Sequence, residues 1–215
     1  MNSTLAARVM RIYEEFDNQI SRLPTQFGIH CPPGCGTCCS SAKVEATPLE
    51  MIPLAEELWR SGRAHALVDQ YDGKALPDIC LFYTPDALHF NHGRCSVYPH
   101  RPTLCRLFGF AAIRNKRGRR EFAACRFVRE MAPQAVLAVQ ADLDSGGEIL
   151  MFTEAASRIG ELEPSMNRQY PINRALWLAL EKTGMILQYT IGESPNELTD
   201  PETDPLEPAP FKRCS

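Results

Sequence analysis

Four cysteines stand within nine residues near the amino terminus, and this short segment constrains the fold more than any other part of the chain. In order, they are Cys31, Cys35, Cys38 and Cys39, separated only by proline, glycine and threonine. Proline lacks a backbone donor and glycine adds conformational freedom, so this composition predicts a tight loop rather than a helix. Thiolates gathered in such a loop repel one another unless a cation or a metal cluster lies among them. The loop therefore predicts a metal site.

Four further cysteines later in the chain complete the set of candidate metal ligands. They are Cys80, Cys95, Cys105 and Cys125. Eight thiolates suit two sites of four ligands each, or one cluster with additional redox or structural thiols. Neighbouring side chains point apart in either strand or helix, so Cys38 and Cys39 rarely bind the same single ion. We expect a polynuclear site, or two sites that share the loop.

Two arginines lie beside the distal cysteines, in the segment CSVYPHRPTLCR of residues 95–106. Two prolines stiffen this segment, and Arg101 and Arg106 place fixed cations near its thiols. Cationic neighbours lower the pKa of a thiol and offset the negative charge of a thiolate-ligated metal. We predict that both arginines contribute to cofactor binding, with ordinary ion pairs as the alternative.

Length and charge limit the classes of protein to which this chain can belong. The 215 residues fit one domain with a real core, and 23 basic against 26 acidic residues point to no particular partner. Charged residues interrupt the first 20 positions, and no run of about 18 apolar residues occurs, so we expect neither a secretory signal nor a membrane span. We predict a cytoplasmic protein, where cysteine clusters are more often metal sites or redox centres than disulfides.

Hydrophobic periodicity and turn signals predict an α+β fold. Helices are expected over residues 5–20, 47–62, 64–71, 133–141, 148–158 and 173–182. Strands are expected over residues 43–46, 79–83, 88–90, 94–98, 107–113 and 121–125. The simplest arrangement is a small antiparallel sheet that carries all four distal cysteines. The predicted architecture is a cysteine-rich metal-binding core with this sheet, flanked by an N-terminal helix and a C-terminal helical group.

The domain organisation follows from composition. Residues 1–192 are expected to form a single domain, with its core at about 28–126 and a C-terminal helical part at about 130–190. From residue 193 the chain is acidic and rich in proline, which predicts a disordered tail over 193–215. Cys214 lies in this tail and is not expected to bind metal.

The cysteine spacing and the residues around it resemble the YkgJ-type cysteine-cluster family. The shared features are the C-x3-C-x2-CC loop, CLF at 80–82, CSVY at 95–98 and RPTLCR at 101–106. The resemblance covers residues 28–126. That family is described as a zinc- or iron-chelating domain, and its relatives include flagellin lysine N-methylases. The resemblance implies metal binding for this chain and hints at an enzyme.

Ligand type alone suits an iron–sulfur cluster and zinc equally well. The adjacent pair Cys38 and Cys39, together with the surplus of thiols, favours iron. One alternative is an enzyme, a methyltransferase or redox catalyst, although the sequence has no nucleotide loop, Rossmann glycine motif or Ser/His/Asp arrangement. Another is a zinc-stabilised interaction module.

A basic hairpin over residues 114–120 and several histidines are the remaining candidate features. The hairpin carries Arg114, Lys116, Arg117, Arg119 and Arg120, which suit an acidic or protein partner or form a solvated tip. No aromatic residues interleave there, which argues against nucleic acid. Histidines near the cysteines are His30, His89, His92 and His100. Because the cysteines suffice as ligands, we expect these histidines to be bystanders or hydrogen-bond donors to the ligands.

Overall fold

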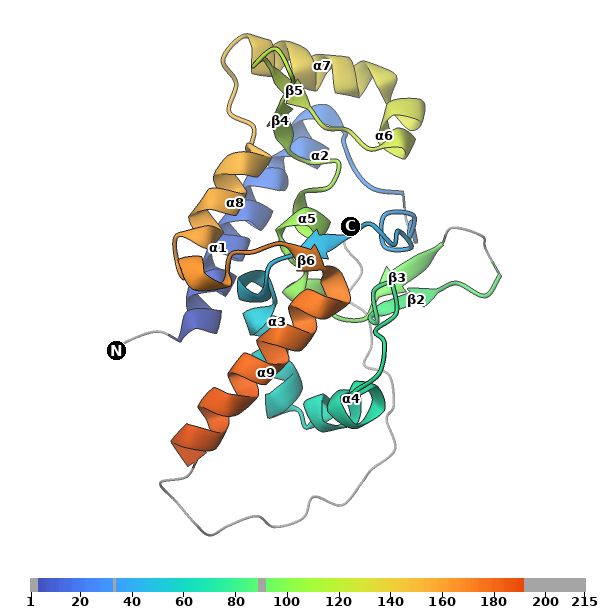
Figure 1. Ribbon diagram of the computed structural model, residues 1–215. Helices are drawn as coiled ribbons and strands as arrows, with labels where there is room; N and C mark the ends of the chain where they lie inside the picture. Colours follow the sequence, from blue (N-terminus) through green and yellow to red (C-terminus); the bar gives the residue numbers. More distant parts are fainter. Residues whose placement is uncertain (1–3, 33, 89–91, 192–215) are drawn as a thin grey trace.

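The computed structural model describes residues 4–32, 34–88 and 92–191 (Figure 1). Its helices are α1 (Leu5–Ile20), α2 (Arg22–Phe27), α3 (Pro48–Arg60), α4 (Arg63–Tyr71), α5 (Thr103–Leu107), α6 (Arg126–Met131), α7 (Pro133–Asp144), α8 (Phe152–Gly160) and α9 (Ile172–Ile191). Short 3-10 turns are η1 (Tyr98–His100) and η2 (Pro164–Met166). The strands are β1 (Glu45–Ala46), β2 (Tyr83–Pro85), β3 (Gly93–Cys95), β4 (Ala112–Arg114), β5 (Arg120–Phe122) and β6 (Tyr170–Pro171). The α+β class is confirmed.

A capping box begins α3, and its hydrogen bonds extend beyond this helix. The side chain of Thr47 accepts from the Glu50 amide at 3.2 Å, and Oε2 of Glu50 accepts from the Thr47 amide at 2.7 Å. The second carboxylate oxygen, Oε1, accepts from the Thr103 amide at 3.1 Å. Tyr13 of α1 donates its hydroxyl to the Glu50 carbonyl at 3.1 Å. Glu50 therefore joins α1, α3 and α5 at one buried point.

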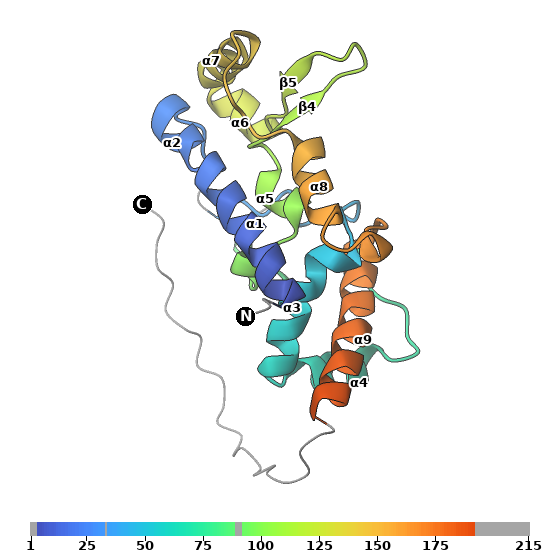
Figure 2. The ribbon, with the colours of Figure 1, turned by 90° about the vertical axis from the view of Figure 1, so that its left-hand side faces the viewer.

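Three large groups of buried apolar side chains hold the helices together. The first lies mainly between α3 and α9 and includes Leu54, Leu58, Leu176 and Leu180. The second joins α1 to α5 and α8 and includes Val9, Phe16, Leu107 and Ile159. The third joins α2, β5, α6 and α7 and includes Leu23, Phe122, Val128 and Val139. Figure 2 shows α1 running along one side of the molecule, from α3 and α9 towards α7.

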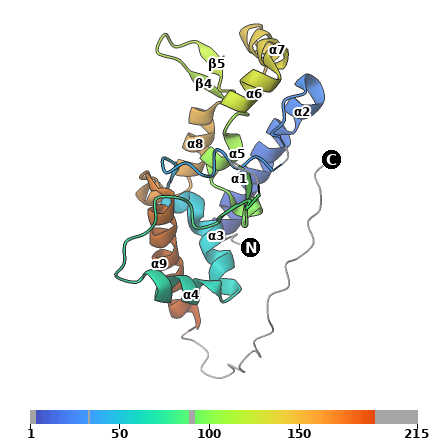
Figure 3. The same ribbon diagram turned by 90° about the vertical axis from the view of Figure 1, so that its right-hand side faces the viewer.

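The cysteine loop lies on the opposite side of the molecule. Figure 1 shows this loop, residues 28–32 and 34–42, between α2 and the strands β2 and β3, and Figure 3 turns that side of the molecule towards the viewer. It therefore runs between the part of the fold built on α3 and α9 and the part built on α2, α6 and α7.

The prediction of one sheet that carries the four distal cysteines was wrong. The strands form three separate antiparallel pairs, β1 with β6, β2 with β3 and β4 with β5. Only Cys95 lies in a strand; Cys105 lies in α5, and Cys125 is the N-cap of α6. Cys80 begins a turn, in which the Tyr83 amide donates to the Cys80 carbonyl at 3.0 Å. That turn replaces the strand predicted over residues 79–83.

Short elements account for most of the other differences. Helices α2, α5 and α6 have five or six residues each, too few to show a helical period in the sequence. The helix predicted over residues 148–158 begins only at Phe152. The predicted tail, with Cys214, and His89 lie outside the described residues. None of the helices in the described ranges is long and apolar enough to cross a membrane.

We expect Leu180→Ala to lower the free energy of unfolding by about 2–5 kcal/mol, because truncating a buried leucine leaves a cavity. Leu180 is 2% exposed in the group between α3 and α9. The matched control is Leu137→Ala in α7, where the side chain is 61% exposed and the expected change is within about 0.5 kcal/mol. Urea denaturation of both variants measures the difference, and equal losses would contradict this account of the core.

Candidate metal centre

Backbone hydrogen bonds close the cysteine loop into two tight turns. The Cys35 amide donates to the Pro32 carbonyl at 3.1 Å. The amides of Cys39 and Ser40 both donate to the Gly36 carbonyl at 3.0 Å. The second turn brings the sulfurs of Cys38 and Cys39 to 3.9 Å from each other. The loop therefore presents an adjacent pair of thiols in a fixed conformation.

Close packing against the β2–β3 hairpin fixes the position of the loop. The Gly93 amide donates to the Gly34 carbonyl at 3.0 Å, and Cys35 forms an isolated β-bridge with His92. A Cβ atom on Gly36 would lie 2.8 Å from the Tyr83 ring and 2.9 Å from the Gly93 amide nitrogen, so only glycine fits there. This contact brings the loop next to the hairpin that carries Cys95.

One loop cysteine and three distal cysteines line a common hollow of about 30 Å³. These four residues are Cys39, Cys80, Cys95 and Cys105. Most of the other lining residues are apolar, and they include Met51, Leu54, Val97 and Ile172. The polar groups at this hollow are His100 and Arg101. Segments that are far apart in sequence therefore meet around thiols.

A residue of α9 positions Cys80. Asn173 is buried, and its amide nitrogen donates to the carbonyls of Pro77 at 2.6 Å and Ile79 at 2.8 Å. Its amide oxygen accepts from the Leu81 amide at 3.1 Å. The turn that carries Cys80 is thus held against α9 on both sides of the cysteine. Sequence reasoning missed Asn173 because it lies 93 positions from Cys80 and has no local motif.

The other four cysteines lie outside this hollow. Cys125 accepts from the Val128 amide through its sulfur at 3.5 Å, at the start of α6. The loss of water around the Cys31 sulfur, followed by the nearby thiols of Cys125, Cys38 and Cys35, raises the pKa of Cys31 to about 11. As a residue, Cys31 is nevertheless the exposed member of the eight. Cys125 is therefore a neighbour of the loop, although 86 positions separate it from Cys39.

Burial and mutual repulsion keep most of these thiols protonated in the metal-free protein. Burial, then the thiols of Cys80, Cys38 and Cys95, raises the pKa of Cys105 to about 12. Burial also raises the pKa of Cys80 and of Cys95. The contact between Cys38 and Cys39 lowers the pKa of Cys38 and raises that of Cys39, because one proton bridges the two sulfurs. Negative charge therefore collects first at Cys38.

The two predicted arginines occupy different environments. The Arg101 guanidinium lies 3.4 Å from the centroid of the Tyr98 ring and donates to the Cys105 carbonyl at 3.3 Å. Burial raises the pKa of Cys95, and the charge of Arg101 offsets part of that rise. The contact with Cys39 lowers the pKa of Cys38, and Arg101 adds to that effect. A part for Arg101 in cofactor binding stays a prediction.

Arg106 is a structural link in this structure. It is 3% exposed, pairs with Asp17 of α1, and donates to the carbonyls of Pro99 and of Arg101, the latter at 2.8 Å. Its guanidinium also lies 4.3 Å from the centroid of the Tyr13 ring. These contacts fix residues 99–106 against α1, and a part for Arg106 in cofactor binding stays a prediction.

His100 is a further candidate ligand that sequence reasoning set aside. It lines the hollow, and its buried Nδ1 atom has no hydrogen-bond partner within the described ranges. Burial lowers the pKa of His100, which favours the neutral imidazole that binds metals. The sequence signal that could have identified His100 is its position between Cys95 and Cys105 in one short segment.

The donor set fits a soft metal, although the ligands are not drawn together. In the parts of the chain that the structure describes, no three His, Cys, Asp or Glu side chains lie at the mutual spacing of a metal site. The eight cysteines are free thiols. Thiolates and imidazole suit zinc and iron, and an orphaned buried nitrogen beside four thiols fits a group that is still to be bound.

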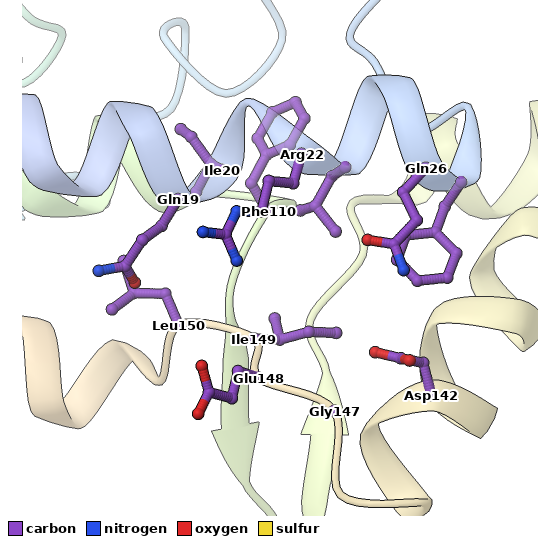
Figure 4. A pocket seen from close by; sticks show the side chains of 12 residues that line it. Gln19, Ile20, Arg22, Gln26, Phe110, Asp142, Gly147, Glu148, Ile149 and Leu150 are labelled. Carbon is purple, nitrogen blue, oxygen red and sulfur yellow. The ribbon is translucent and has the colours of Figure 1, made fainter.

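A larger hollow lies elsewhere and lacks this chemistry. It has a volume of about 220 Å³ and is lined by α1, α2, Phe110 and the segment before α8. Figure 4 shows Arg22 and Gln26 on one side of it, with Asp142 and Glu148 on the other. None of its lining residues is a cysteine or a histidine. The size of a hollow therefore does not identify the metal centre in this protein.

Contacts within the chain engage much of the charge on the basic hairpin. Arg114 donates to the Gly118 carbonyl at 3.1 Å, and Arg120 donates to the Leu143 carbonyl at 2.7 Å. Arg119 lies 3.5 Å from the carboxylate of Asp144. These contacts tie the hairpin to the end of α7. An acidic or protein partner at residues 114–120 stays a prediction.

A loop, a turn, a hairpin and two short helices carry the eight thiols, which are the donors expected of a cysteine-rich chelating domain. Residues 30–126 match the family model CxxCxxCC, described as "Putative zinc- or iron-chelating domain". This range contains all eight candidate ligands, and the match confirms the resemblance seen in the sequence for this part of the chain. No curated protein and no solved structure matches the chain significantly.

Replacing Arg101 and Arg106 one at a time should distinguish a structural role from an electrostatic role at the metal centre. Arg106→Gln removes a buried cation and leaves carbonyl acceptors unpaired, so the metal-free protein should lose about 2 kcal/mol or more of stability. Arg101→Gln should change stability by about 1 kcal/mol or less but weaken metal binding, because the thiols lose a nearby positive charge. Chemical denaturation and competition with a chelator measure the two effects. Weakened binding in Arg106→Gln alone would contradict the assignment.

Metal binding should release protons and strengthen with pH. The raised pKa values of Cys31 and Cys105 mean that these ligands carry protons at neutral pH, and an ion must displace them. We expect about two or more protons released per ion and an apparent affinity that rises from about pH 6 to about pH 8. Calorimetry in buffers of different ionisation enthalpy counts the protons. Binding without proton release would show that the ligands are already thiolates.

Proposed function

We propose that this chain is a cytoplasmic metal-binding protein whose cysteines hold iron, as an iron–sulfur cluster, or zinc. The observation that carries the proposal is the hollow lined by Cys39, Cys80, Cys95 and Cys105, within a domain that contains all eight cysteines and is described as zinc- or iron-chelating. A reducing compartment would keep these cysteines as thiols available to a metal.

The electrostatics of the thiols support this function. Burial raises the pKa of Cys80, Cys95 and Cys105, so the protein carries them as neutral thiols without a metal. A bound cation would supply the positive charge that lets these sulfurs ionise in a water-poor site. Arg101 would offset part of the remaining negative charge, as cations beside thiolate-ligated metals do.

Two features favour iron over zinc. A structural zinc site uses four ligands, and eight thiols exceed that number. The sulfurs of Cys38 and Cys39 are adjacent and 3.9 Å apart, an arrangement that a polynuclear site uses more readily than a single ion. We therefore propose iron as the principal metal of the loop.

Residues 1–192 are proposed to act as one domain around this centre. Helices α1 and α9 come from opposite ends of the described chain, and both pack on α3. Ile172 and Asn173 of α9 lie outside the matched family range, yet one lines the hollow and the other holds the turn of Cys80. The flanking helices would then form part of the metal centre.

Anaerobic purification decides between the metals. We expect brown protein that absorbs broadly in the visible and contains iron and acid-labile sulfide. Cys35→Ser or Cys105→Ser should bleach it, whereas Cys214→Ser should leave the spectrum unchanged because Cys214 belongs to the acidic, Pro-rich tail. Colourless protein with stoichiometric zinc would contradict the choice of iron and leave metal binding intact. Protein that takes up neither metal would contradict the function.

A further inference from the structure

We infer that the larger hollow, between α2 and residues 147–150, binds a small zwitterion, namely an α-amino acid with a large apolar side chain. None of the residues that line this hollow is a cysteine or a histidine, so the metal centre has no part in the inference. The inference adds a second binding site to the chain and is tested separately from the proposed metal binding.

The floor of the hollow is apolar. Leu23 of α2 is 4% exposed, and Phe27, Phe110 and Ile149 are partly buried against the same group of core side chains. All four residues line the hollow, and the three partly buried side chains leave apolar surface open to a ligand. Leu23 and Phe27 are four positions apart, which places them on one face of α2. An apolar body that covers this floor gains free energy from the water that it displaces.

Charged side chains of opposite sign lie on the two sides of this floor. Figure 4 shows Arg22 on one side, with Asp142 and Glu148 across the hollow. Within the described ranges, the side chains of these three residues form no ion pair and no hydrogen bond. A ligand carboxylate pairs with Arg22, and a ligand ammonium pairs with Asp142 and Glu148. Gln19 and Gln26 lie on either side of the Arg22 guanidinium and add amide donors and acceptors (Figure 4).

Backbone contacts fix the wall that carries Asp142. The Gly147 amide donates to the Asp142 carbonyl at 2.8 Å, and Arg120 of β5 donates to the Leu143 carbonyl at 2.7 Å. A Cβ atom on Gly147 would lie 2.0 Å from Oδ2 of Asp142 and 2.8 Å from its carbonyl oxygen, so only glycine fits beside this carboxylate. This wall is therefore formed before a ligand binds, which lowers the entropic cost of binding.

The volume of the hollow suits a ligand of this kind. An apolar cavity of about 150 Å³ holds benzene, and pockets for drug-sized ligands measure about 300–1,000 Å³. The hollow, at about 220 Å³, lies between the two and suits an aromatic ring with an amino acid head group. A phosphate ester is disfavoured, because it brings negative charge to a hollow lined by two carboxylates and one guanidinium.

Calorimetric titration of the full chain with L-phenylalanine tests the inference, together with two probes that each lack one charge. Phenethylamine keeps the ammonium and lacks the carboxylate, whereas hydrocinnamate keeps the carboxylate and lacks the ammonium. We expect saturable binding of about one phenylalanine per chain. Phenethylamine should bind more weakly because it does not engage Arg22. Hydrocinnamate should bind most weakly of all, because Asp142 and Glu148 repel its charge.

Single substitutions assign each charge of the ligand to its partner. Arg22→Gln should weaken phenylalanine binding about tenfold and leave phenethylamine binding unchanged, since only phenylalanine carries a carboxylate. Asp142→Asn and Glu148→Gln should each weaken the binding of both ligands, because both ligands carry the ammonium. Arg11→Gln is the matched control. It removes an exposed arginine of α1 that does not line the hollow, and it should change neither affinity.

Three outcomes would overturn the inference. The first is the absence of saturable phenylalanine binding up to about 10 mM. The second is an equal loss of phenylalanine and phenethylamine binding in Arg22→Gln, which would show that the guanidinium does not hold the carboxylate. The third is hydrocinnamate binding as tight as that of phenylalanine, which would leave the two acidic side chains without a role. Metal uptake by the same protein is measured independently, so each outcome leaves the proposed function standing.

Discussion

The buried carboxylate of Glu50 holds together the elements on which the metal centre depends. One of its oxygens caps α3 at Thr47, and the other receives the Thr103 amide at the start of α5. Helix α5 carries Cys105 and Arg106, and the pairing of Arg106 with Asp17 extends the same connection to α1. A buried carboxylate is tolerated only when hydrogen bonds satisfy it, and here those bonds come from backbone amides. The position of Cys105 is thus set by a polar contact within an otherwise apolar core.

The buried thiols near this point are costly to ionise, and the protein alone supplies too little positive charge to offset that cost. Burial favours their neutral form, the pair Cys38 and Cys39 concentrates charge on one sulfur, and Arg101 supplies positive charge nearby. A soft metal cation would remove the conflict between burial and ionisation, because it would replace the protons and be neutralised by the thiolates.

The family domain ends at residue 126, but the centre extends beyond it. Helix α9 adds a wall of the hollow through Ile172 and holds the Cys80 turn through Asn173. Helices α6 and α7 complete the apolar group against which Cys125 packs. Two separately packed groups of side chains therefore support one set of ligands, and a chain that kept only the cysteine segment would lose the supports of Cys80 and Cys125.

The sequence by itself determined the features that depend on local chemistry. The loop of Cys31 to Cys39 follows from proline and glycine, α1 and α3 follow from periodicity and turn signals, and the expectation of a soft metal follows from eight thiols. Only the tertiary structure decided which thiols share a hollow, because that depends on contacts between residues far apart in the chain, such as Asn173 with the Cys80 turn. It also separated Arg101, which lies near sulfurs, from Arg106, which pairs with Asp17, although both read alike as cations beside cysteines. The prediction of a single sheet was wrong for the same reason: short apolar segments become strand, turn or helix according to what they pack against.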